Sequence, residues 1–326
     1  MGIKEVIERI KKHQAFLITS HTRLEGDALG SELAFCNLVK KLGKKAIIVN
    51  EEEVPARYRF LPGEHIAKKI DKQMKSNIKF DCFTVLDCSD LKRCRMVSEM
   101  NVNKKPIINI DHHISNVGFG QANWVDPSAS SCSEMIYKLY KKLRLSFDRD
   151  TAVCLYVGML TDTGSFRYTN TTAFTHKAVA DLLVQKVEVN KIYRNIYENI
   201  PFNEFKIFSR VLPNIKLTYF NRIAWAKVHD PLLGNINDGL SIDIAESVLN
   251  FARAIEGVDV AVSFKKNAGK KDEIRVNLRS QGKVDVNKIA KRFGGGGHPT
   301  ASGCTIRGNI DKIIRRVLEE IKKSMK

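Results

Sequence analysis

The sequence lacks the features that mark secreted, zinc-stabilised or membrane-spanning proteins. Its seven cysteines contain no C-x-x-C pair, which indicates reduced thiols and neither a disulfide framework nor a structural zinc site. No apolar run approaches the about 20 residues that cross a bilayer. Glu5 and Glu8 interrupt the first residues, where a signal peptide would be apolar. We therefore expect a cytoplasmic protein with no membrane partner.

Acidic residues are few relative to basic ones. The chain has 54 Lys and Arg against 36 Asp and Glu, a formal net charge of +18. Such an excess favours polyanionic partners, either nucleic acid, nucleotides or anionic membrane. The alternative is that the lysines only form solvated surfaces, and the charge alone does not decide between the two.

Short apolar segments alternate with helical patterns in the first half of the chain. Strands are expected at 15–20, 44–50, 80–90 and 106–113, and helices at 3–12, 28–42, 129–143 and 149–161. The strands are dense in Val, Ile and Phe, as is typical of strands buried on both faces. The alternation predicts an α/β fold with a mostly parallel, doubly wound sheet.

The second half has a different pattern. Residues 173–210 are helical and charged, with Pro201 and Pro213 as breaks, and further strands and helices follow from about 222. A length of 326 residues suits two compact domains. We expect a first domain over 1–190, a helical linker over 191–215 and a smaller α/β domain over 216–326, with a catalytic cleft between the two domains.

Carboxylates and imidazoles stand where the predicted apolar elements of the first half end. They are His21, Glu25, Asp27, Asp87, Asp111, His112, His113 and Asp162. Parallel strands bring their carboxyl ends to one edge of a sheet, so we expect these groups to meet there. Taken singly, an Asp-Gly turn or a His pair is usually structural. Together they are hard to explain as structure alone.

This many carboxylates cannot stay ionised side by side without compensating cations, because like charges raise one another's pKa. Carboxylate and imidazole ligands without cysteine favour Mn²⁺, with Mg²⁺ or another divalent ion as alternatives. There are enough ligands for two ions about 3.5–4 Å apart, an arrangement that activates water for phosphoryl displacement. The sequence thus predicts a two-metal phosphoesterase centre.

The ordered motifs resemble those of the DHH phosphoesterase superfamily. They are SHTRLEGDALGS at 20–31, LDCSD at 86–90, Asp-His-His at 111–113, TDTGSF at 161–166, NLRS at 277–280 and GGGGHPTASG at 294–303. The last two resemble the DHH-associated domain, which binds substrate. Within the superfamily the chain is most similar to the NrnA type, the nanoRNases and pAp phosphatases. The resemblance implies hydrolysis of short RNA and pAp, and a homodimer is a possible assembly.

The resemblance also implies a role for each matching residue. One Mn²⁺ would be held by His21, Glu25 and Asp87, and the other by Asp27, Asp87, His112 and Asp162. His113 would contact the scissile phosphate, and Asp111 would orient a histidine through its ring N–H. In the second domain, substrate binding is expected from Arg279, Ser280, Gly295, Gly296, Gly297 and His298. Arginine suits this task because its guanidinium group binds phosphate bidentately.

One position departs from the family pattern, which has Asp where this chain has Glu25. Glutamate keeps the charge but adds a methylene, which displaces the carboxylate unless the loop adjusts. Either Glu25 still binds metal or it faces solvent and the first metal site is weak. The departure leaves open a nucleotide-binding sensor with an impaired metal site. A phosphodiesterase of cyclic or linear dinucleotides, such as c-di-AMP and pApA, also stays open, because it would use the same metal site and the same glycine-histidine pocket.

Overall fold

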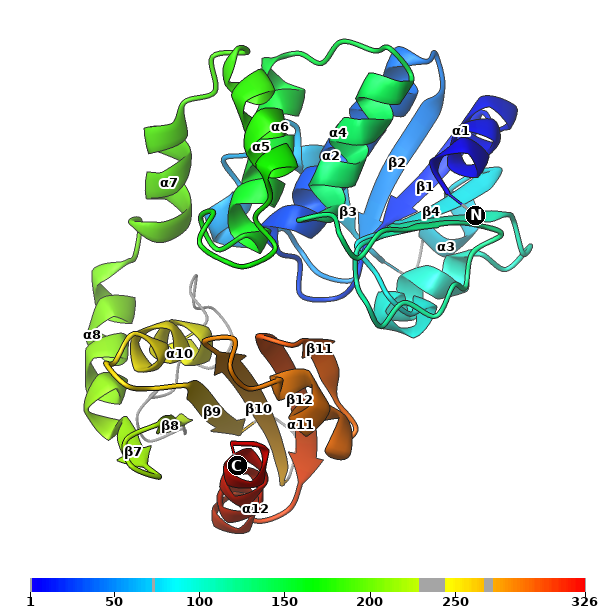
Figure 1. Cartoon of the computed structure of the whole chain (residues 1–326). Helices are drawn as coiled ribbons and strands as arrows, with labels where there is room; N and C mark the ends of the chain where they lie inside the picture. Colours follow the sequence, from blue (N-terminus) through cyan, green and yellow to red (C-terminus); the bar gives the residue numbers. More distant parts are fainter. Residues whose placement is uncertain (1, 72–73, 229–243, 267–271, 326) are drawn as a thin grey trace. The chain divides into compact units, whose positions relative to one another are not determined.

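The computed structural model describes residues 2–71, 74–228, 244–266 and 272–325. These residues divide into two compact units, Met1–Glu198 and Asn199–Lys326, which are described separately (Figure 1). The Lys-rich turn at 265–272 lies largely outside the described residues. Among the helices that are described, none combines the length and apolar character needed to cross a bilayer.

The first unit is built on a six-stranded parallel sheet in the order β3-β2-β1-β4-β5-β6. Its strands are β1 (Ala15–Thr19), β2 (Lys45–Asn50), β3 (Ala67–Lys69), β4 (Cys82–Leu86), β5 (Ile107–Asp111) and β6 (Ala122–Val125). The chain runs outward in one direction from β1 to β3 and in the other from β4 to β6. The direction therefore reverses between β1 and β4, which is where open α/β sheets bind ligands.

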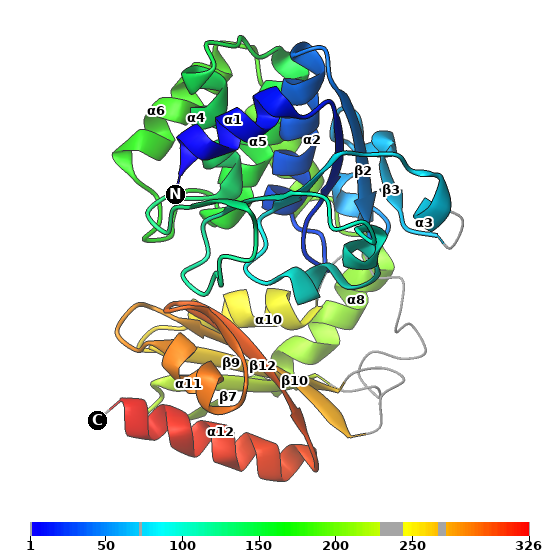
Figure 2. The ribbon, with the colours of Figure 1, turned by 90° about the vertical axis from the view of Figure 1, so that its right-hand side faces the viewer.

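Helices cover this sheet on both faces, as the alternating sequence pattern predicts. They are α1 (Ile3–Lys12), α2 (Gly26–Lys41), α3 (Met74–Asn77), α4 (Cys132–Lys142), α5 (Arg149–Asp162), α6 (Ala173–Leu183) and α7 (Val189–Tyr197). One core joins α1, α2, α4 and α5 to one face (Figure 2). The 3₁₀ helix η3 (Leu91–Met100) and α3 pack over the other face. Two shorter 3₁₀ helices are η1 (Ala56–Tyr58) and η2 (Glu64–Ile66).

Helix α2 is buried around most of its circumference because it packs closely against α5. A Cβ on Gly30 would overlap the carbonyl oxygen of Cys154, so only glycine allows this approach of the two helices. The N-termini of the neighbouring helices are capped by side chains: Ser131 accepts the N–H of Glu134, and Asp148 accepts that of Thr151. These caps fix where α4 and α5 begin, and so where their ends meet the sheet edge.

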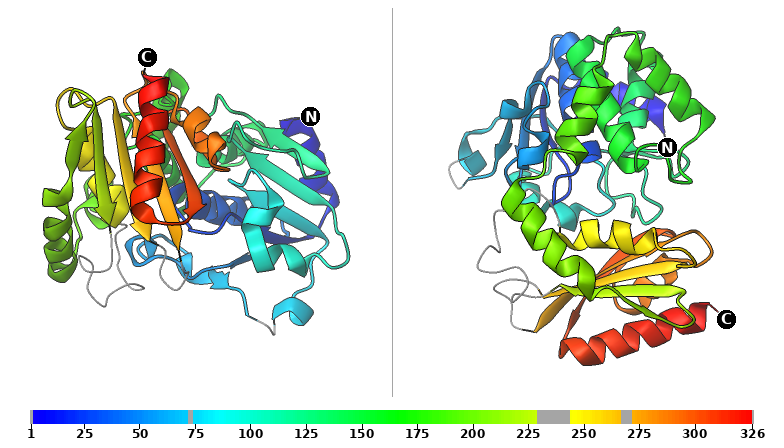
Figure 3. Two further views of the ribbon diagram at one scale, coloured as in Figure 1. Left: turned by 90° about the horizontal axis from the view of Figure 1, so that it is seen from below. Right: turned by 90° about the vertical axis from the view of Figure 1, so that its left-hand side faces the viewer.

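The second unit contains a mixed six-stranded sheet in the order β11-β12-β10-β9-β8-β7. Its elements are α8 (Phe202–Val211), η4 (Leu212–Asn214), β7 (Lys216–Thr218), β8 (Ile223–Val228), α10 (Ile244–Arg253), β9 (Val260–Lys266), β10 (Glu273–Ser280), α11 (Val286–Arg292), β11 (Gly296–His298), β12 (Ala301–Arg307) and α12 (Ile310–Ser324). Helix α10 packs on one face, and α11 and α12 pack on the other (Figure 3).

The predicted fold class is confirmed, and the predicted strands and helices form close to their expected bounds. The short edge strands β3, β6 and β7 were not anticipated, because three or four residues are too few to show a periodicity. The glycine run at 294–297 leads into β11, which pairs with β12.

Candidate metal centre

Three neighbouring strands of the first sheet end in the predicted polar groups. His21 lies two residues beyond the end of β1, Asp87 follows β4, and Asp111, His112 and His113 stand at the end of β5. Because β1, β4 and β5 are adjacent, these side chains reach one place at the point where the sheet order reverses. The structure therefore brings together residues that are far apart in the sequence.

His112 lies at the middle of the group and is 3% exposed. Its Nε2 atom is 3.4 Å from Asp87 Oδ1, 3.6 Å from Asp162 Oδ2 and 3.9 Å from Asp27 Oδ2. The ligand atoms of Asp27, Asp87 and His112 all lie within 4.8 Å of one another. Asp162 reaches this group from the last residue of α5. This donor set of carboxylate oxygens and an imidazole fits a hard or borderline divalent cation.

Asp87 contacts three histidines from a strained backbone position. Its φ of 50° is in the left-handed region, which is uncommon outside glycine. Its Oδ2 is 3.4 Å from His21 Nε2, and its Oδ1 is 3.6 Å from His113 Nδ1. Burial raises the pKa of this carboxyl, but the imidazoles of His112 and His21 outweigh that effect and hold it well below its usual range. Asp87 Oδ1 is buried without a hydrogen-bond partner, as expected of an atom arranged for a metal ion.

Asp27 is held by the first backbone N–H groups of α4. Cys132 N donates to Asp27 Oδ2 at 2.7 Å, and Ser133 N donates to Oδ1 at 2.8 Å. A helix N-terminus favours negative charge, which fixes the carboxylate facing His112. Burial and the nearby Asp87 nevertheless raise the pKa of Asp27 to about 6. For Asp162, burial raises the pKa well above its usual range against the attraction of His112. A bound cation would relieve both effects.

Asp111 is fully buried and contacts the histidine two residues later. Its Oδ1 is 2.7 Å from His113 Nδ1, and its Oδ2 accepts a hydrogen bond of 2.6 Å from Asn116 Nδ2. This pairing directs Nδ1 of His113 toward Asp111 and Nε2 away from it. Asn116 was not anticipated, since a lone asparagine in a loop gives no sequence signal.

Glu25 stands apart from the buried groups. Its side chain is exposed, and it occupies the N-cap position of α2 without forming a side-chain cap. Its negative charge still acts on the centre electrostatically, since it contributes to raising the pKa of His21 and of Asp162. The structure thus places Glu25 at the margin of the group, while the other predicted ligands of the first domain are mostly buried.

Sequence reasoning missed a buried acid beside the centre, Glu32 on α2, which is 0% exposed. Its Oε2 accepts a 2.8 Å hydrogen bond from Asn50 Nδ2, while Oε1 is buried without a partner. Asn50 in turn accepts from the Thr19 hydroxyl. The available signal was a charged residue inside the apolar run of a helix that the fold buries.

We expect Glu32 to make the metal-free protein less stable as pH rises. Burial raises the pKa of its carboxyl from 4.5 to about 7, so the folded chain holds the proton that the unfolded chain releases. The stabilisation that comes from protonated Glu32 is complete below about pH 4.5 and is lost as the pH rises through about 7. Glu32→Gln cannot ionise and should lose less stability over this range, by on the order of 3 kcal/mol.

Urea unfolding of the metal-free protein at pH 4.5 and pH 8 measures this difference. Glu8→Gln, on the exposed side of α1, is the control and should follow the unaltered protein. Parallel pH dependence in the unaltered protein and Glu32→Gln would contradict the assignment.

In the second unit, the predicted phosphate-binding arginine already has a carboxylate partner. Arg279 Nε donates to Glu246 Oε1 at 3.0 Å, and Nη2 donates to Oε2 at 2.6 Å, which is a bidentate ion pair with α10. The Ser280 hydroxyl accepts the N–H of Gly282 within a turn. A phosphate at Arg279 would therefore share the guanidinium with Glu246 or displace it.

The predicted glycines have structural reasons of their own. A Cβ on Gly295 would overlap the carbonyl oxygen of Gly303, and one on Gly297 would lie 2.7 Å from Ser302 Oγ. Both glycines are therefore required by the close approach to β12. A Cβ on Gly296 would have Asn287 Oδ1 as its nearest neighbour, at 4.0 Å, so this glycine is not required by packing. His298 ends β11, and its carbonyl accepts the Ser302 hydroxyl at 2.7 Å.

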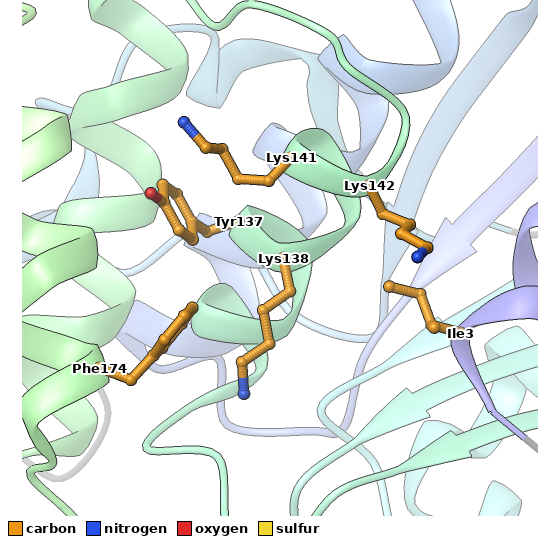
Figure 4. Close-up of a pocket in the computed structure, with 6 residues that line it drawn as sticks. All are labelled: Ile3, Tyr137, Lys138, Lys141, Lys142 and Phe174. Carbon is orange, nitrogen blue, oxygen red and sulfur yellow. The ribbon is translucent and has the colours of Figure 1, made fainter.

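A surface hollow on the first unit is lined by residues of a different kind. They are Ile3, Tyr137, Lys138, Lys141, Lys142 and Phe174 (Figure 4). Lys138 lies over the Phe174 ring at 4.8 Å and pairs with Glu134 at 2.8 Å, and Lys141 pairs with Asp181. Two of its cations are thus already neutralised, and its lining has no acid or imidazole to bind a metal.

Comparisons with known proteins agree with the arrangement of motifs and strands. Residues 15–159 match the DHH family N-terminal domain, and residues 227–323 match the DHHA1 domain. The chain belongs to the DHH family. The metal-ligand candidates from His21 to His112 lie within the match to the DHH N-terminal domain, and Asp162 lies just beyond its end. The DHHA1 match includes Arg279 and His298.

Relatives named as NrnA-type enzymes align over nearly the whole chain. The "Bifunctional oligoribonuclease and PAP phosphatase NrnA" of Thermus thermophilus is 29% identical over 94% of this chain and 89% of its own length. The protein of that name from Bacillus subtilis is 28% identical over 93% of this chain and 92% of its own.

Solved structures share the fold. An exopolyphosphatase-related protein of Bacteroides fragilis superposes with a TM-score of 0.87 at 25% identity, covering 98% of this chain and 95% of its own. A putative family II inorganic pyrophosphatase of Methanococcus jannaschii has a TM-score of 0.50 at 12% identity, covering 94% and 99%. The second likeness concerns the fold alone.

Proposed function

We propose that this DHH family protein is a divalent-metal-dependent phosphoesterase that hydrolyses short oligoribonucleotides and pAp, with Mn²⁺ as the favoured ion. The observation that carries the proposal is the approach of Asp27, Asp87 and Asp162 to one imidazole nitrogen of His112, within 3.9 Å in each case. The names of the NrnA relatives support the substrate class.

Divalent ions at such a centre supply an activated water and stabilise the charge that develops on the phosphoryl oxygens. We assign one ion to Asp27, Asp87, His112 and Asp162, and a second to His21, Asp87 and Glu25. Asp87 is common to both sets, because its two oxygens face His112 and His21 respectively.

His113 is proposed to bind the scissile phosphate through Nε2. Its Nδ1 is 2.7 Å from the buried Asp111 carboxylate, which fixes the orientation of the ring. In this orientation the ring is proposed to contact a phosphoryl oxygen and to act as an acid toward the leaving oxygen. In the second unit, Arg279 and His298 are proposed to bind the nucleotide distal to the cleaved bond. A homodimer and a cytoplasmic location stay predictions.

The test is hydrolysis by the purified protein with Mn²⁺ of labelled RNA dimers to pentamers, pAp and cyclic di-AMP. Release of mononucleotides from the short RNAs, or of AMP and phosphate from pAp, supports the proposal. Preference for cyclic di-AMP would reassign the enzyme to dinucleotide signalling. Measurable binding with no hydrolysis of any substrate would indicate a nucleotide sensor.

Substituting Glu25→Asp is expected to raise activity. The shorter side chain restores the residue of the family pattern and brings the carboxylate nearer the backbone that carries it. The ion assigned to His21, Asp87 and residue 25 should therefore bind more tightly. A gain of about tenfold in the rate at limiting Mn²⁺ is expected. Titration of the rate against Mn²⁺ measures it, with Glu8→Asp, an exposed position on α1, as the control. An unchanged Mn²⁺ dependence would place Glu25 outside the ligand set.

A further inference from the structure

Two cysteines meet at a buried spot directly beside the metal centre. Cys88 follows Asp87, and Cys94 lies in the first turns of η3. Their Sγ atoms are 3.7 Å apart, and the residues are 0% and 1% exposed. An S–S bond is about 2.0 Å long, so a movement of roughly 1.7 Å would join the two sulfurs.

The backbone around Cys88 connects this pair to the residues at the end of β5. The Cys88 carbonyl accepts hydrogen bonds from Asn109 Nδ2 at 3.1 Å and Asn116 Nδ2 at 3.3 Å. The same Asn116 amide donates to Asp111 at 2.6 Å. A shift of Cys88 therefore changes the position of Asp87 directly and the support of Asp111 through Asn116.

The backbone around Cys94 connects the pair to the end of β1. The carbonyl of Arg93 accepts the N–H of Thr22 at 3.0 Å, and Thr22 follows His21. A shift of Cys94 toward Cys88 therefore pulls on the segment that carries His21. The two sulfurs thus lie between two strand ends that both supply groups to the centre.

The segment that carries Cys94 is one that yields easily. η3 consists of 3₁₀ turns, whose hydrogen bonds are weaker than those of an α-helix. Arg95 interrupts it with a φ of 45° and a ψ of −123°, a strained conformation for a residue with a side chain. Local opening of this segment would admit a small oxidant to thiols that are otherwise covered.

We propose that Cys88 and Cys94 form a reversible disulfide that disables the metal centre when the protein meets hydrogen peroxide. One thiolate attacks the peroxide, the O–O bond breaks, and a sulfenic acid and one water form. The second thiol then displaces the hydroxyl as a second water, so the two thiol hydrogens and both peroxide oxygens leave as water. A dithiol reductant reverses the step by exchange. The predicted loss of turnover rests on the proposed function, whereas formation of the disulfide does not.

The chemical half of the test uses the full chain treated with hydrogen peroxide in the absence of metal. Differential alkylation and peptide mapping should show a Cys88–Cys94 linked peptide, with the mass of two hydrogens lost, that disappears on treatment with dithiothreitol. Failure to find this linked peptide while other thiols are oxidised would overturn the proposal without bearing on the enzyme's activity.

The functional half follows removal of the peroxide with catalase and addition of Mn²⁺. The oxidised protein should bind Mn²⁺ more weakly by calorimetry and hydrolyse RNA dimers about 10- to 100-fold more slowly, the range for loss of groups that support metal ligands. Dithiothreitol should restore both. Cys94→Ser should keep the untreated rate and resist peroxide, and Cys36→Ser, a buried thiol on α2, should respond as the unaltered protein does.

Two outcomes of this functional half would overturn the inference. The first is an equal loss of Mn²⁺ binding in the Cys94→Ser protein, which would place the damage elsewhere. The second is a mapped disulfide that leaves Mn²⁺ affinity unchanged. If neither oxidised nor reduced protein hydrolyses any substrate while Mn²⁺ binding responds as expected, the proposed function fails and the disulfide stands.

Discussion

Asp87→Asn is expected to give a folded protein that has lost Mn²⁺ binding and hydrolysis. Asp87 contacts His21, His112 and His113, and its two oxygens are assigned to two ions. Loss of an outer partner of a metal ligand costs about 10- to 100-fold, and loss of a ligand shared by both ions should exceed that. Asparagine is almost isosteric and tolerates the left-handed φ of 50°, so the backbone has no reason to change.

Calorimetry with Mn²⁺ and the rate of RNA dimer hydrolysis measure the effect. Thermal unfolding of the metal-free variant checks that the fold is intact. Asp181→Asn is the matched control, because Asp181 pairs with Lys141 on the surface of α6 and should leave both measurements unchanged. Near-normal turnover by Asp87→Asn would remove Asp87 from the centre and, with it, the two-ion assignment.

Gly158→Ala is expected to damage stability and metal binding together. A Cβ at this position in α5 would overlap the Ser133 hydroxyl and lie 2.7 Å from Asp27 Oδ1. Forcing an extra carbon into a packed site typically costs about 1–3 kcal/mol. The contact also pushes Asp27 away from the N–H groups of α4 that hold it, so Mn²⁺ affinity should fall as well.

Urea unfolding and Mn²⁺ calorimetry on the same preparation separate the two effects. Gly2→Ala is the control, since a Cβ at Gly2 meets nothing within 4 Å. Adding Ser133→Ala to the Gly158→Ala protein removes the clash with the hydroxyl, the shortest of three contacts that also include the Ser133 Cβ and Asp27 Oδ1, and should return part of the stability. Metal affinity should recover less, because the contact with Asp27 persists. An unaltered unfolding curve for Gly158→Ala would show that α4 and α5 have room to separate.

The agreement between sequence and structure is greatest for the first sheet. Runs such as those ending at Thr19, Leu86 and Asp111 are long and apolar enough to predict buried strands. Because the carboxyl ends of parallel strands lie at one edge of the sheet, the polar residues that follow these strands are expected to lie together there. Short edge strands escaped prediction because their pairing depends on a neighbour more than on their own residues.

In the second unit the sequence predicted further strands and helices but not how the ligand candidates are engaged. Arg279 was expected to be available to phosphate, yet it forms a bidentate ion pair with Glu246. Gly295 and Gly297 were expected to bind substrate, and both are also needed for the close approach to β12. An arginine or a glycine has many uses, and only its surroundings select one of them.

The sequence by itself determined which chemical groups the centre has and which strand ends carry them, because side-chain chemistry and the periodicity of buried strands are local properties. Only the tertiary structure decided that Asp27 is held by Cys132 N, 105 residues away, that Glu32 is buried beside the centre, and that Cys88 meets Cys94. Contacts of this kind arise when helices and strands pack at close range, and no local pattern in the chain records them.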